Sequence, residues 1–364
     1  AGYSVPDGGL VIDLGPMAAV RVAADGTATI GAAGRLGGVY TAVAGAGRAL
    51  PAGSCPTVGI GGLTLGGGVG VLARAYGLTC DRLQSAQVVT PDSVLRTASA
   101  QDEPDLLWAL RGGGGGNGGV VTSFTFSTEP APTVTVFSLR FAAGTAADVV
   151  AAWQGWIAAA PDELWSTCPV SGGPMPTARV AGAFVGDERG CRDQVARLTA
   201  SSPPPTMTTV SQRDYLRAMR WFAGSSDRAA FVASSRVLPA PLADPSALVD
   251  LLPRAGVDVL LDSLGGAIAR TDPATSAFPY RSAFASAQIY ASVTGGDPRP
   301  ATASVAEIRD GLAALTGPTG YVNYIDPGMP DWARTYYGDN LPRLREVVDR
   351  YDPDRVLAFA QGLA

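Results

Sequence analysis

Two short stretches of the sequence hold side chains that could do chemistry. The first, GSCPTVGIGGLTLGGGVG at residues 53–70, places Cys55 directly before a proline and then mixes glycine with small aliphatic residues. A cysteine on such a loop can act as a nucleophile once its thiol is ionised. The second, YVNYID at residues 321–326, holds two tyrosines, and a tyrosine can be a general base if a partner lowers its pKa. Together the two stretches predict covalent or proton-transfer chemistry on a ligand that the glycine-rich backbone can approach closely.

Each stretch also has a purely structural explanation. A single cysteine is most often a small buried hydrophobic side chain, and tyrosines commonly pack with only their hydroxyls at the surface. The glycines of 53–70, and a second block at 112–116, could bind a diphosphate through backbone N–H groups or could form turns. The second block follows a helix-like segment rather than a strand, which disfavours a Rossmann dinucleotide motif. The pattern leaves the diphosphate site and the structural turn open.

Composition excludes several kinds of chemistry. All 27 basic residues are arginine and histidine is absent, which excludes Ser-His-Asp triads, histidine metal sites and lysine-containing phosphate loops. A net charge of −5 argues against nucleic acid as a partner. No apolar run reaches membrane-spanning length and no targeting segment is visible. We therefore expect a soluble protein with no membrane partner, and the choice between secretion and the cytoplasm stays open.

The cysteines carry no metal-binding pattern. Cys55, Cys80, Cys168 and Cys191 lie far apart and lack zinc-ligand spacing, so no metal site is expected. Cys80 is expected in the core. Cys168 and Cys191 could form a disulfide if the protein is exported, or could remain free buried thiols.

Several elements must position the two reactive stretches. Alternating residues around an Asp25–Gly26 turn predict a β-hairpin, and a helix is expected from about Pro104 before a strand at 120–126. The composition changes at 128–134, which predicts a domain boundary. Strands and helices then mix in an α+β pattern. The tail is predicted to be a helix with an apolar stripe at Leu341, Leu344, Val347 and Val348.

The whole chain resembles the berberine-bridge-enzyme-like FAD-linked oxidases of the vanillyl-alcohol-oxidase superfamily. The matching segments follow the family's order: AGYSVPDGGLVIDL, GSCPTVGIGGLTLGGGVG, GLTCDRLQSAQVVTPD, PDLLWALRGGGGGNGGVVTSFTF, FPYRSAFASAQIYA, YVNYIDP and YYGDNLPRLREVVDRYDPDRV. The resemblance implies an α+β, two-domain PCMH-type FAD-binding fold. It assigns an FAD-binding domain to residues 1–128, a substrate-binding domain of antiparallel sheet covered by helices to 129–320, and a segment returning to the FAD domain to 321–364.

The resemblance also implies roles for individual residues. Cys55 matches the cysteine that bonds to C6 of the flavin ring, and Tyr324 matches the tyrosine that takes the substrate hydroxyl proton as hydride leaves for flavin N5. Tyr321 and Gln288 would line the substrate side and complete the catalytic set. The residues expected to contact FAD are Cys55, Pro56, Thr57, Val58, Gly59, Gly61, Gly62, Leu63, Gly66, Gly67, Gly115, Gly116, Asn117, Gly119, Val120, Asn323 and Tyr324.

The sequence departs from the family pattern where the family uses histidine. The segment with the first FAD subdomain and its flavin-linking histidine would lie before Ala1. Leu63 and Tyr280 stand where many members have histidine, and Gly118 replaces the phenylalanine of an NFG motif.

The activity implied by the resemblance is FAD-dependent oxidation of an alcohol-type carbon. The substrate would be a small molecule, such as a sugar, an oligosaccharide or a natural product, and O2 would reoxidise the flavin to give hydrogen peroxide. Two alternatives remain open. The first is a dehydrogenase with another electron acceptor, and the second is a non-catalytic flavin- or ligand-binding protein. The oligomeric state is not predicted.

Overall fold

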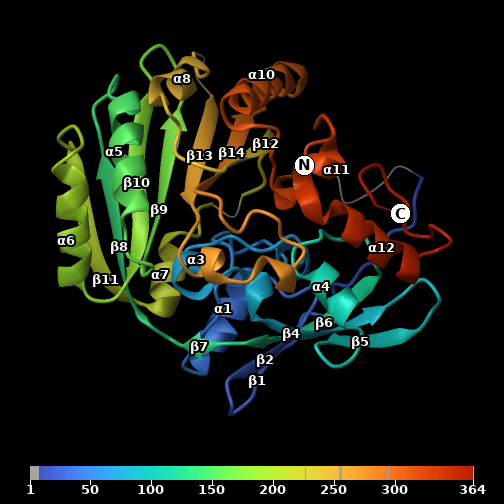
Figure 1. The fold of residues 1–364 in the computed structure, drawn as a ribbon. Helices are drawn as coiled ribbons and strands as arrows, with labels where there is room; N and C mark the ends of the chain where they lie inside the picture. Colours follow the sequence, from blue (N-terminus) through green and yellow to red (C-terminus); the bar gives the residue numbers. More distant parts are fainter. Residues whose placement is uncertain (1–7, 226, 254–255, 294, 364) are drawn as a thin grey trace.

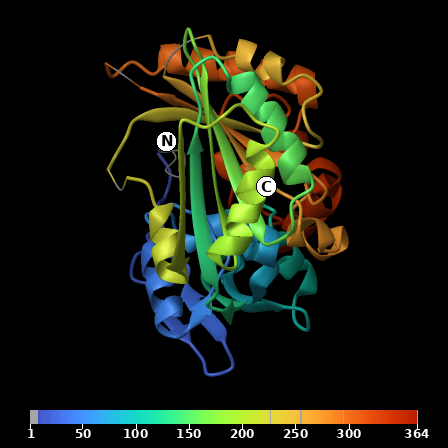
Figure 2. The same cartoon turned by 90° about the vertical axis from the view of Figure 1, so that its left-hand side faces the viewer.

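The strands of the protein form two main antiparallel sheets. The structure is a computed structural model that describes residues 8–225, 227–253, 256–293 and 295–363. In the view of Figure 1 a five-stranded sheet lies below a seven-stranded one. The turned view in Figure 2 shows the early part of the chain gathered at the bottom and the larger sheet rising above it. This arrangement agrees with the predicted α+β fold of two main parts, while the predicted boundaries at 128 and 320 stay predictions.

The five-stranded sheet is built by the first part of the chain. In the order β1-β2-β6-β4-β5 its strands are β1 (Val20–Val22), β2 (Thr27–Gly31), β6 (Val120–Ser127), β4 (Leu83–Val89) and β5 (Leu95–Ser99). The predicted hairpin at Asp25–Gly26 is confirmed. The Asp25 carboxylate accepts the Thr27 N–H at 2.8 Å, and Gly26 has φ +86°, which glycine adopts without strain.

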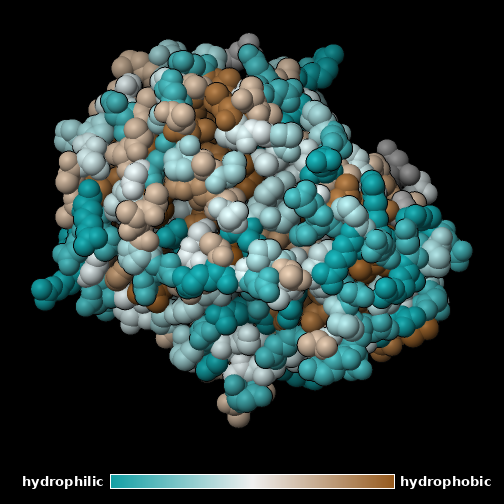
Figure 3. All heavy atoms as spheres, in the orientation of Figure 1, coloured by the Kyte–Doolittle hydropathy of each residue, from teal (hydrophilic) through white to brown (hydrophobic). Residues whose placement is uncertain are grey.

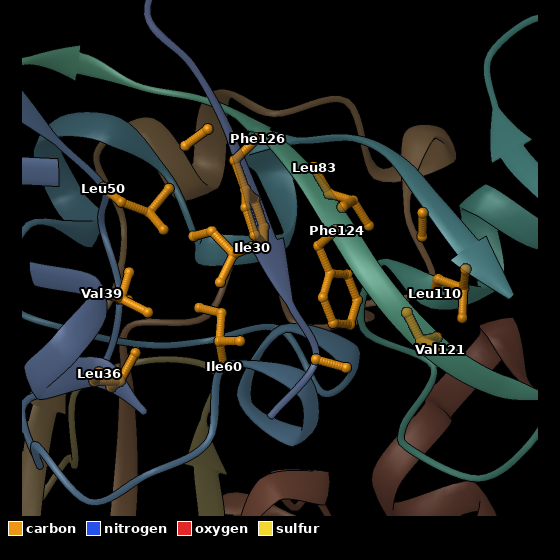
Figure 4. Packing of buried hydrophobic residues seen from close by; sticks show 14 of the residues in the cluster. Ile30, Leu36, Val39, Leu50, Ile60, Leu83, Leu110, Val121, Phe124 and Phe126 are labelled. Carbon is orange, nitrogen blue, oxygen red and sulfur yellow. The ribbon is translucent and has the colours of Figure 1, made fainter. Parts of the chain in front are cut away.

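Helices and glycine-rich turns cover this sheet. They include α1 (Leu36–Gly45), α2 (Ile60–Leu65), α3 (Ala73–Tyr76), α4 (Pro104–Leu110) and the short 3-10 turn η1 (Thr79–Arg82). Figure 4 shows Ile30, Phe124 and Phe126 of the sheet packed toward Leu36, Val39 and Ile60 of the helices. Burying one such side chain contributes roughly 1.5–3 kcal/mol. The glycine-rich stretch is therefore anchored through its few aliphatic residues.

The seven-stranded sheet follows in the chain. In the order β11-β8-β10-β9-β13-β14-β12 its strands are β11 (Met207–Asp214), β8 (Thr133–Arg140), β10 (Thr177–Val185), β9 (Leu164–Ser171), β13 (Val257–Ser263), β14 (Ala285–Ser292) and β12 (Phe231–Leu238). A further two-stranded ladder pairs β3 (Arg48–Ala49) with β7 (Glu129–Pro130). Every pairing within the large sheet is antiparallel.

Helices pack on one face of this sheet. They are α5 (Ala146–Ala158), α6 (Glu188–Thr199), α8 (Pro245–Asp250) and α10 (Arg299–Thr316). In β13 the residues Val257, Val259 and Leu261 face these helices, and Asp258, Leu260 and Asp262 face the other side. Figure 3 shows hydrophobic residues gathered between the upper helices and hydrophilic residues over α4 and α12. No helix was predicted over residues 299–316, so α10 was missed.

The remaining elements connect the two parts. They are α7 (Tyr215–Trp221), α9 (Ala267–Arg270), α11 (Trp332–Tyr337), α12 (Leu341–Tyr351), η2 (Pro273–Thr275), η3 (Val322–Tyr324) and η4 (Gly338–Asn340). The predicted apolar stripe of the tail is confirmed, because Leu344, Val347 and Val348 are buried and Leu341 packs beside them. Helix α12 lies against α4 (Figure 1).

The structure distinguishes between a disulfide and free thiols at Cys168 and Cys191. Cys168 and Cys191 are buried free thiols, so the disulfide between them is wrong and the alternative of free thiols is confirmed. Burial raises the pKa of Cys191 to about 12, which keeps its thiol protonated. Cys80 is fully buried, as predicted. Among the described residues no helix combines the length and apolarity needed to cross a bilayer.

A buried ion pair joins the two parts beside Cys80. The Arg281 guanidinium, with 2% of its side chain exposed, contacts both carboxylate oxygens of Asp81 at 2.6 and 2.8 Å. It also donates to the Ser276 hydroxyl and lies 5.3 Å from the ring centre of Phe278. A buried pair of this kind fixes geometry more than it adds net stability. The loop at 276–284 is thereby held against the glycine-rich part of the chain.

Candidate active site

Cys55 lies on an exposed turn held against the start of α1. The Leu36 N–H donates to the Val58 carbonyl and the Gly37 N–H donates to the Pro56 carbonyl, both at 3.0 Å. The turn itself is closed by the Val58 N–H, which donates to the Cys55 carbonyl at 3.2 Å. Cys55, Thr57, Val58 and Gly59 are exposed, and Pro56 is partly buried. The thiol is thus presented at the surface of a fixed turn rather than packed in the core.

The glycines of this stretch fall into two groups. At Gly59 and Gly62 an added Cβ would meet no other atom within 4 Å, so the backbone there borders open space. At Gly61 a Cβ would lie 2.8 Å from the Ala32 carbonyl oxygen, and at Gly66 it would lie 2.1 Å from the Asn323 side chain. Gly67 has φ +120° and a Cβ there would press on Phe278. The first group could admit a ligand, and the second is required by packing within the chain.

The second glycine block meets the first. The Gly114 N–H donates to the Leu65 carbonyl at 2.8 Å, and Gly115 and Gly116 are exposed just beyond it. Gly119 is buried with φ +143° against Val88 and Val89, where β6 begins at the partly buried Val120.

The Asn117 side chain is buried and hydrogen-bonded to three other residues. Its amide nitrogen lies 3.1 Å from the Gly113 carbonyl and 3.4 Å from the Tyr337 hydroxyl, and its oxygen accepts the Leu363 N–H at 3.0 Å. These bonds tie the second glycine block to the C-terminal part of the chain. The predicted contact of Asn117 with FAD stays a prediction.

The Tyr321 hydroxyl connects the loop at 321–326 to the first glycine block. Its oxygen accepts the N–H groups of Gly68 and Val69 at 2.9 and 3.2 Å. The Asn323 amide donates to the same oxygen at 2.9 Å and to the Leu63 carbonyl at 3.0 Å. Tyr321 is 3% exposed, so this buried oxygen is the shared acceptor for the N–H groups of three other residues.

Tyr324 lies next to Tyr321 at the junction of the two parts. The two rings meet edge to face with their centres 5.1 Å apart. Burial raises the pKa of Tyr324 well above its ordinary value, and the nearby Asp262, Tyr321 and Cys55 raise it further. The described neighbours of Tyr324 therefore do not lower its pKa, and its role as the base stays a prediction. Tyr324 holds its proton at neutral pH.

Asp262 is a functional candidate that the sequence reasoning missed. It is partly buried on the side of β13 that faces away from the helices, and burial raises its pKa to about 6. Gln288 lies on the same sheet face, one row further along β14, because Ser286 pairs with Asp262 and Gln288 pairs with Leu260. The only sequence signal for Asp262 was its place as a polar residue in the alternating strand VDVLLDS.

An open cavity of about 610 Å³ lies between residues 13–20 and the start of α1. It is lined by Asp13, Leu14, Gly15, Ala18, Val20, Ala33, Gly34, Arg35, Gly38 and Val39. The Gly34 carbonyl accepts the Ile60 N–H at 2.8 Å, and Arg35 forms a bridge with Gly59. Two lining residues of the cavity are therefore bonded to the backbone at Gly59 and Ile60.

Comparison with known proteins identifies the family. A family model for an FAD binding domain matches residues 1–99, and a model described as "Berberine and berberine like" matches residues 320–364. The uncharacterized FAD-linked oxidoreductase YgaK of Bacillus subtilis is 34% identical over 99% of this chain and 82% of the relative. The chain belongs to the berberine-bridge-enzyme-like FAD-linked oxidoreductases.

Relatives with a named activity and known structures agree with this assignment. The chitooligosaccharide oxidase of Gibberella zeae is 32% identical and is aligned over the whole of this chain and 79% of its own length. A solved chitooligosaccharide oxidase superposes with a TM-score of 0.89 at 29% identity, covering 95% of this chain and 80% of that one. The BBE-like 1 protein of Physcomitrella patens gives a TM-score of 0.89 at 28% identity, over 96% and 80% of the two chains.

The residues of this chain fit an FAD of the berberine-bridge-enzyme-like family. The cofactor is long and carries an anionic diphosphate, and such groups bind best to exposed backbone N–H groups and glycine. Gly59 and Gly62 offer backbone with free space beside it, next to the exposed thiol of Cys55 and the cavity at Arg35. In the second block Gly115 and Gly116 are exposed as well, with Leu65 near the first and Phe359 near the second.

Two glycine substitutions test this division of the glycines. We expect Gly66→Ala to lower the free energy of unfolding by about 1–3 kcal/mol, because its Cβ would collide with the Asn323 amide. Gly62→Ala, on helix α2 with open space beside it, should leave that free energy unchanged or raise it by up to about 1 kcal/mol. The same Gly62→Ala change should weaken FAD binding.

Urea unfolding and FAD titration of the two variants measure both effects. An unchanged FAD affinity in Gly62→Ala would contradict the view that Gly62 borders the ligand. An unchanged stability in Gly66→Ala would contradict the view that packing requires Gly66.

Proposed function

We propose that the chain is an FAD-dependent oxidase acting on an alcohol-type carbon of a sugar, an oligosaccharide or a natural product. Bound FAD supplies the two-electron acceptor, and O2 is the proposed final acceptor with hydrogen peroxide as product. The observation that carries the proposal is the position of Tyr324, whose ring meets that of Tyr321 edge to face and whose pKa is raised by the nearby Asp262 and Cys55. The printed activity of the chitooligosaccharide oxidase relative supports an oligosaccharide among the possible substrates.

The backbone of residues 55–62 and of Gly115 and Gly116 would hold the cofactor. Cys55 is the proposed attachment point, because its thiol is exposed on a turn that α1 fixes. A covalent bond would hold the flavin in place without requiring a larger binding surface.

Tyr324 is the proposed group that handles the substrate hydroxyl proton. Its phenol oxygen accepts that proton, and its own proton must leave because a phenol carries only one. The Asp262 carboxylate, ionised above a pKa of about 6, is the proposed acceptor for it. A partly buried carboxylate near a partly buried phenol can take such a proton directly or through one water molecule.

Tyr321 and Asn323 have a positioning role in this proposal. Both are bound to the glycine block, so they fix the short turn η3 on which Tyr324 lies. Gln288 would contact the substrate from the sheet face that also carries Asp262.

The first prediction for this mechanism concerns the Tyr324 hydroxyl. Tyr324→Phe should retain FAD and its fold but lose about 10²–10⁴-fold in turnover, because the proton acceptor is removed. Tyr351→Phe is the matched control, since it removes a phenol that donates to Glu103 at the start of α4. Turnover is followed by both peroxide formation and dye reduction, which also separates an oxidase from a dehydrogenase. Full turnover in Tyr324→Phe would rule out the proposed base.

The second prediction concerns the pH dependence given by Asp262. Its pKa in the fold, about 6, is above the ordinary value of 3.8, so its contribution to stability is lost as the pH rises through about 6. Asp262→Asn should therefore unfold at a higher temperature than the wild type above pH 6 while turning over much more slowly. In the wild type, turnover should decline below about pH 6 as the carboxylate is protonated. An acid limb that persists in Asp262→Asn would assign the titration to another group.

The third prediction concerns the attachment of the flavin. Acid precipitation of the wild type should leave the yellow colour with the protein, whereas Cys55→Ala should release it to the supernatant. Ser54→Ala, a change at the residue before Cys55 and outside the set expected to contact FAD, should behave like the wild type. Colour that remains with the Cys55→Ala pellet would show that the flavin is attached elsewhere.

A further inference from the structure

The sheet face that carries Asp262 continues outward from the junction. Along β13 the residues on this face are Asp262, Leu260 and Asp258, and their neighbours on β14 are Ser286, Gln288 and Tyr290. Asp258 lies four residues from Asp262, which is roughly 13 Å along the strand. A substrate oxidised beside Tyr324 and Asp262 must therefore be elongated to reach Asp258.

Two aromatic rings stack at this outer position. Phe231 of β12 and Tyr290 of β14 lie with ring centres 5.0 Å apart and planes 28° from parallel. Both are partly buried, and their strand neighbours Val232, Ile289 and Ala291 face the helices, so the two rings lie on the open side of the sheet. A stacked pair of this kind offers a flat surface to a sugar ring or a cation.

A carboxylate lies directly beside the rings. Asp258 pairs in register with Tyr290 across β13 and β14, so the two side chains are cross-strand neighbours. Within the described residues no arginine comes within 4.0 Å of the Asp258 carboxylate. Among the described residues its charge takes part in no ion pair, and a cationic ligand would complement it.

We propose that Asp258, Tyr290 and Phe231 form an outer subsite that binds a protonated amino group on an elongated oligosaccharide. The rings cover one side of the aminated sugar, and the Asp258 carboxylate pairs with its ammonium group. Oxidation takes place at the other end of the substrate, beside Tyr324. This inference rests on the proposed function, because it names the substrate class of the same site.

Two matched trisaccharides test the outer subsite. The first is cellotriose, and the second is cellotriose with one hydroxyl of the non-reducing ring replaced by an amino group. Binding to the flavin-loaded protein is measured by calorimetry, so the readout does not require turnover. The aminated sugar should bind about 10-fold more tightly than cellotriose at low salt, and the difference should shrink as salt screens the charges.

Three variants locate the effect. Asp258→Asn should abolish the preference for the aminated sugar, and Tyr290→Leu should weaken the binding of both sugars. Asp250→Asn removes an exposed charge of the same sign from helix α8, on the covered side of the sheet, and should keep the preference. It thereby controls for a change in net charge.

The outcomes separate this inference from the proposed function. Equal binding of the two sugars, a preference that survives in Asp258→Asn, or no binding of either sugar would overturn the outer subsite. A protein without flavin, or with full turnover in Tyr324→Phe, would overturn the proposed function even if the preference for the amino group were observed.

Discussion

The site depends on one buried oxygen, the Tyr321 hydroxyl. It accepts hydrogen bonds from the Gly68 and Val69 N–H groups and from the Asn323 amide, while the Tyr321 N–H donates to the Ser235 hydroxyl of β12. One residue thereby joins the glycine-rich turn, the large sheet and the loop at 321–326. Leaving these buried donors without a partner would cost about 1–3 kcal/mol for each. The Tyr321 hydroxyl therefore has a structural role, because it holds these segments together. Tyr324 is the neighbouring phenol that we propose takes part in the chemistry.

Strand β13 contributes to both the hydrophobic core and the proposed site, because its residues point alternately to the two faces of the sheet. Val257, Val259 and Leu261 fill the space under the helices, and the residues between them form the open face on which Asp258 and Asp262 lie. Because successive residues of a strand point to opposite faces, a one-residue shift in register would bury both carboxylates among the helices. The pairing with β14 and β9 on either side prevents that shift. The position of the site is thus fixed by the same pattern that builds the core.

Local features of the fold and of the site could be predicted from the sequence. The hairpin at Asp25–Gly26, the helix from Pro104 and the stripe of the tail each follow from patterns over a few residues. The residue types and their surroundings singled out Cys55 and the tyrosines of 321–326, and the resemblance to the family added their roles and the order of the parts. Motifs of this kind indicate which residues could take part in the chemistry. They do not give the burial or the neighbours of each residue.

The remaining features required the tertiary structure. Asp262 lies far from Tyr324 in the chain, and only the pairing of strands and the packing at the junction bring it close. The sequence could not separate Gly62, which borders open space, from Gly66, which Asn323 fills, because the distinction depends on distant side chains. The raised pKa of Tyr324 likewise follows from burial between the two parts.

The most direct test of this account is a crystal structure of the protein with its flavin bound. The account predicts that the flavin ring lies between the Cys55 thiol and the Tyr324 hydroxyl, with the backbone of Gly59 and Gly62 against the cofactor. The open sheet face at Asp262 should then border the same space. A flavin bound away from the Cys55 turn, or one separated from Tyr324 by other parts of the protein, would contradict it.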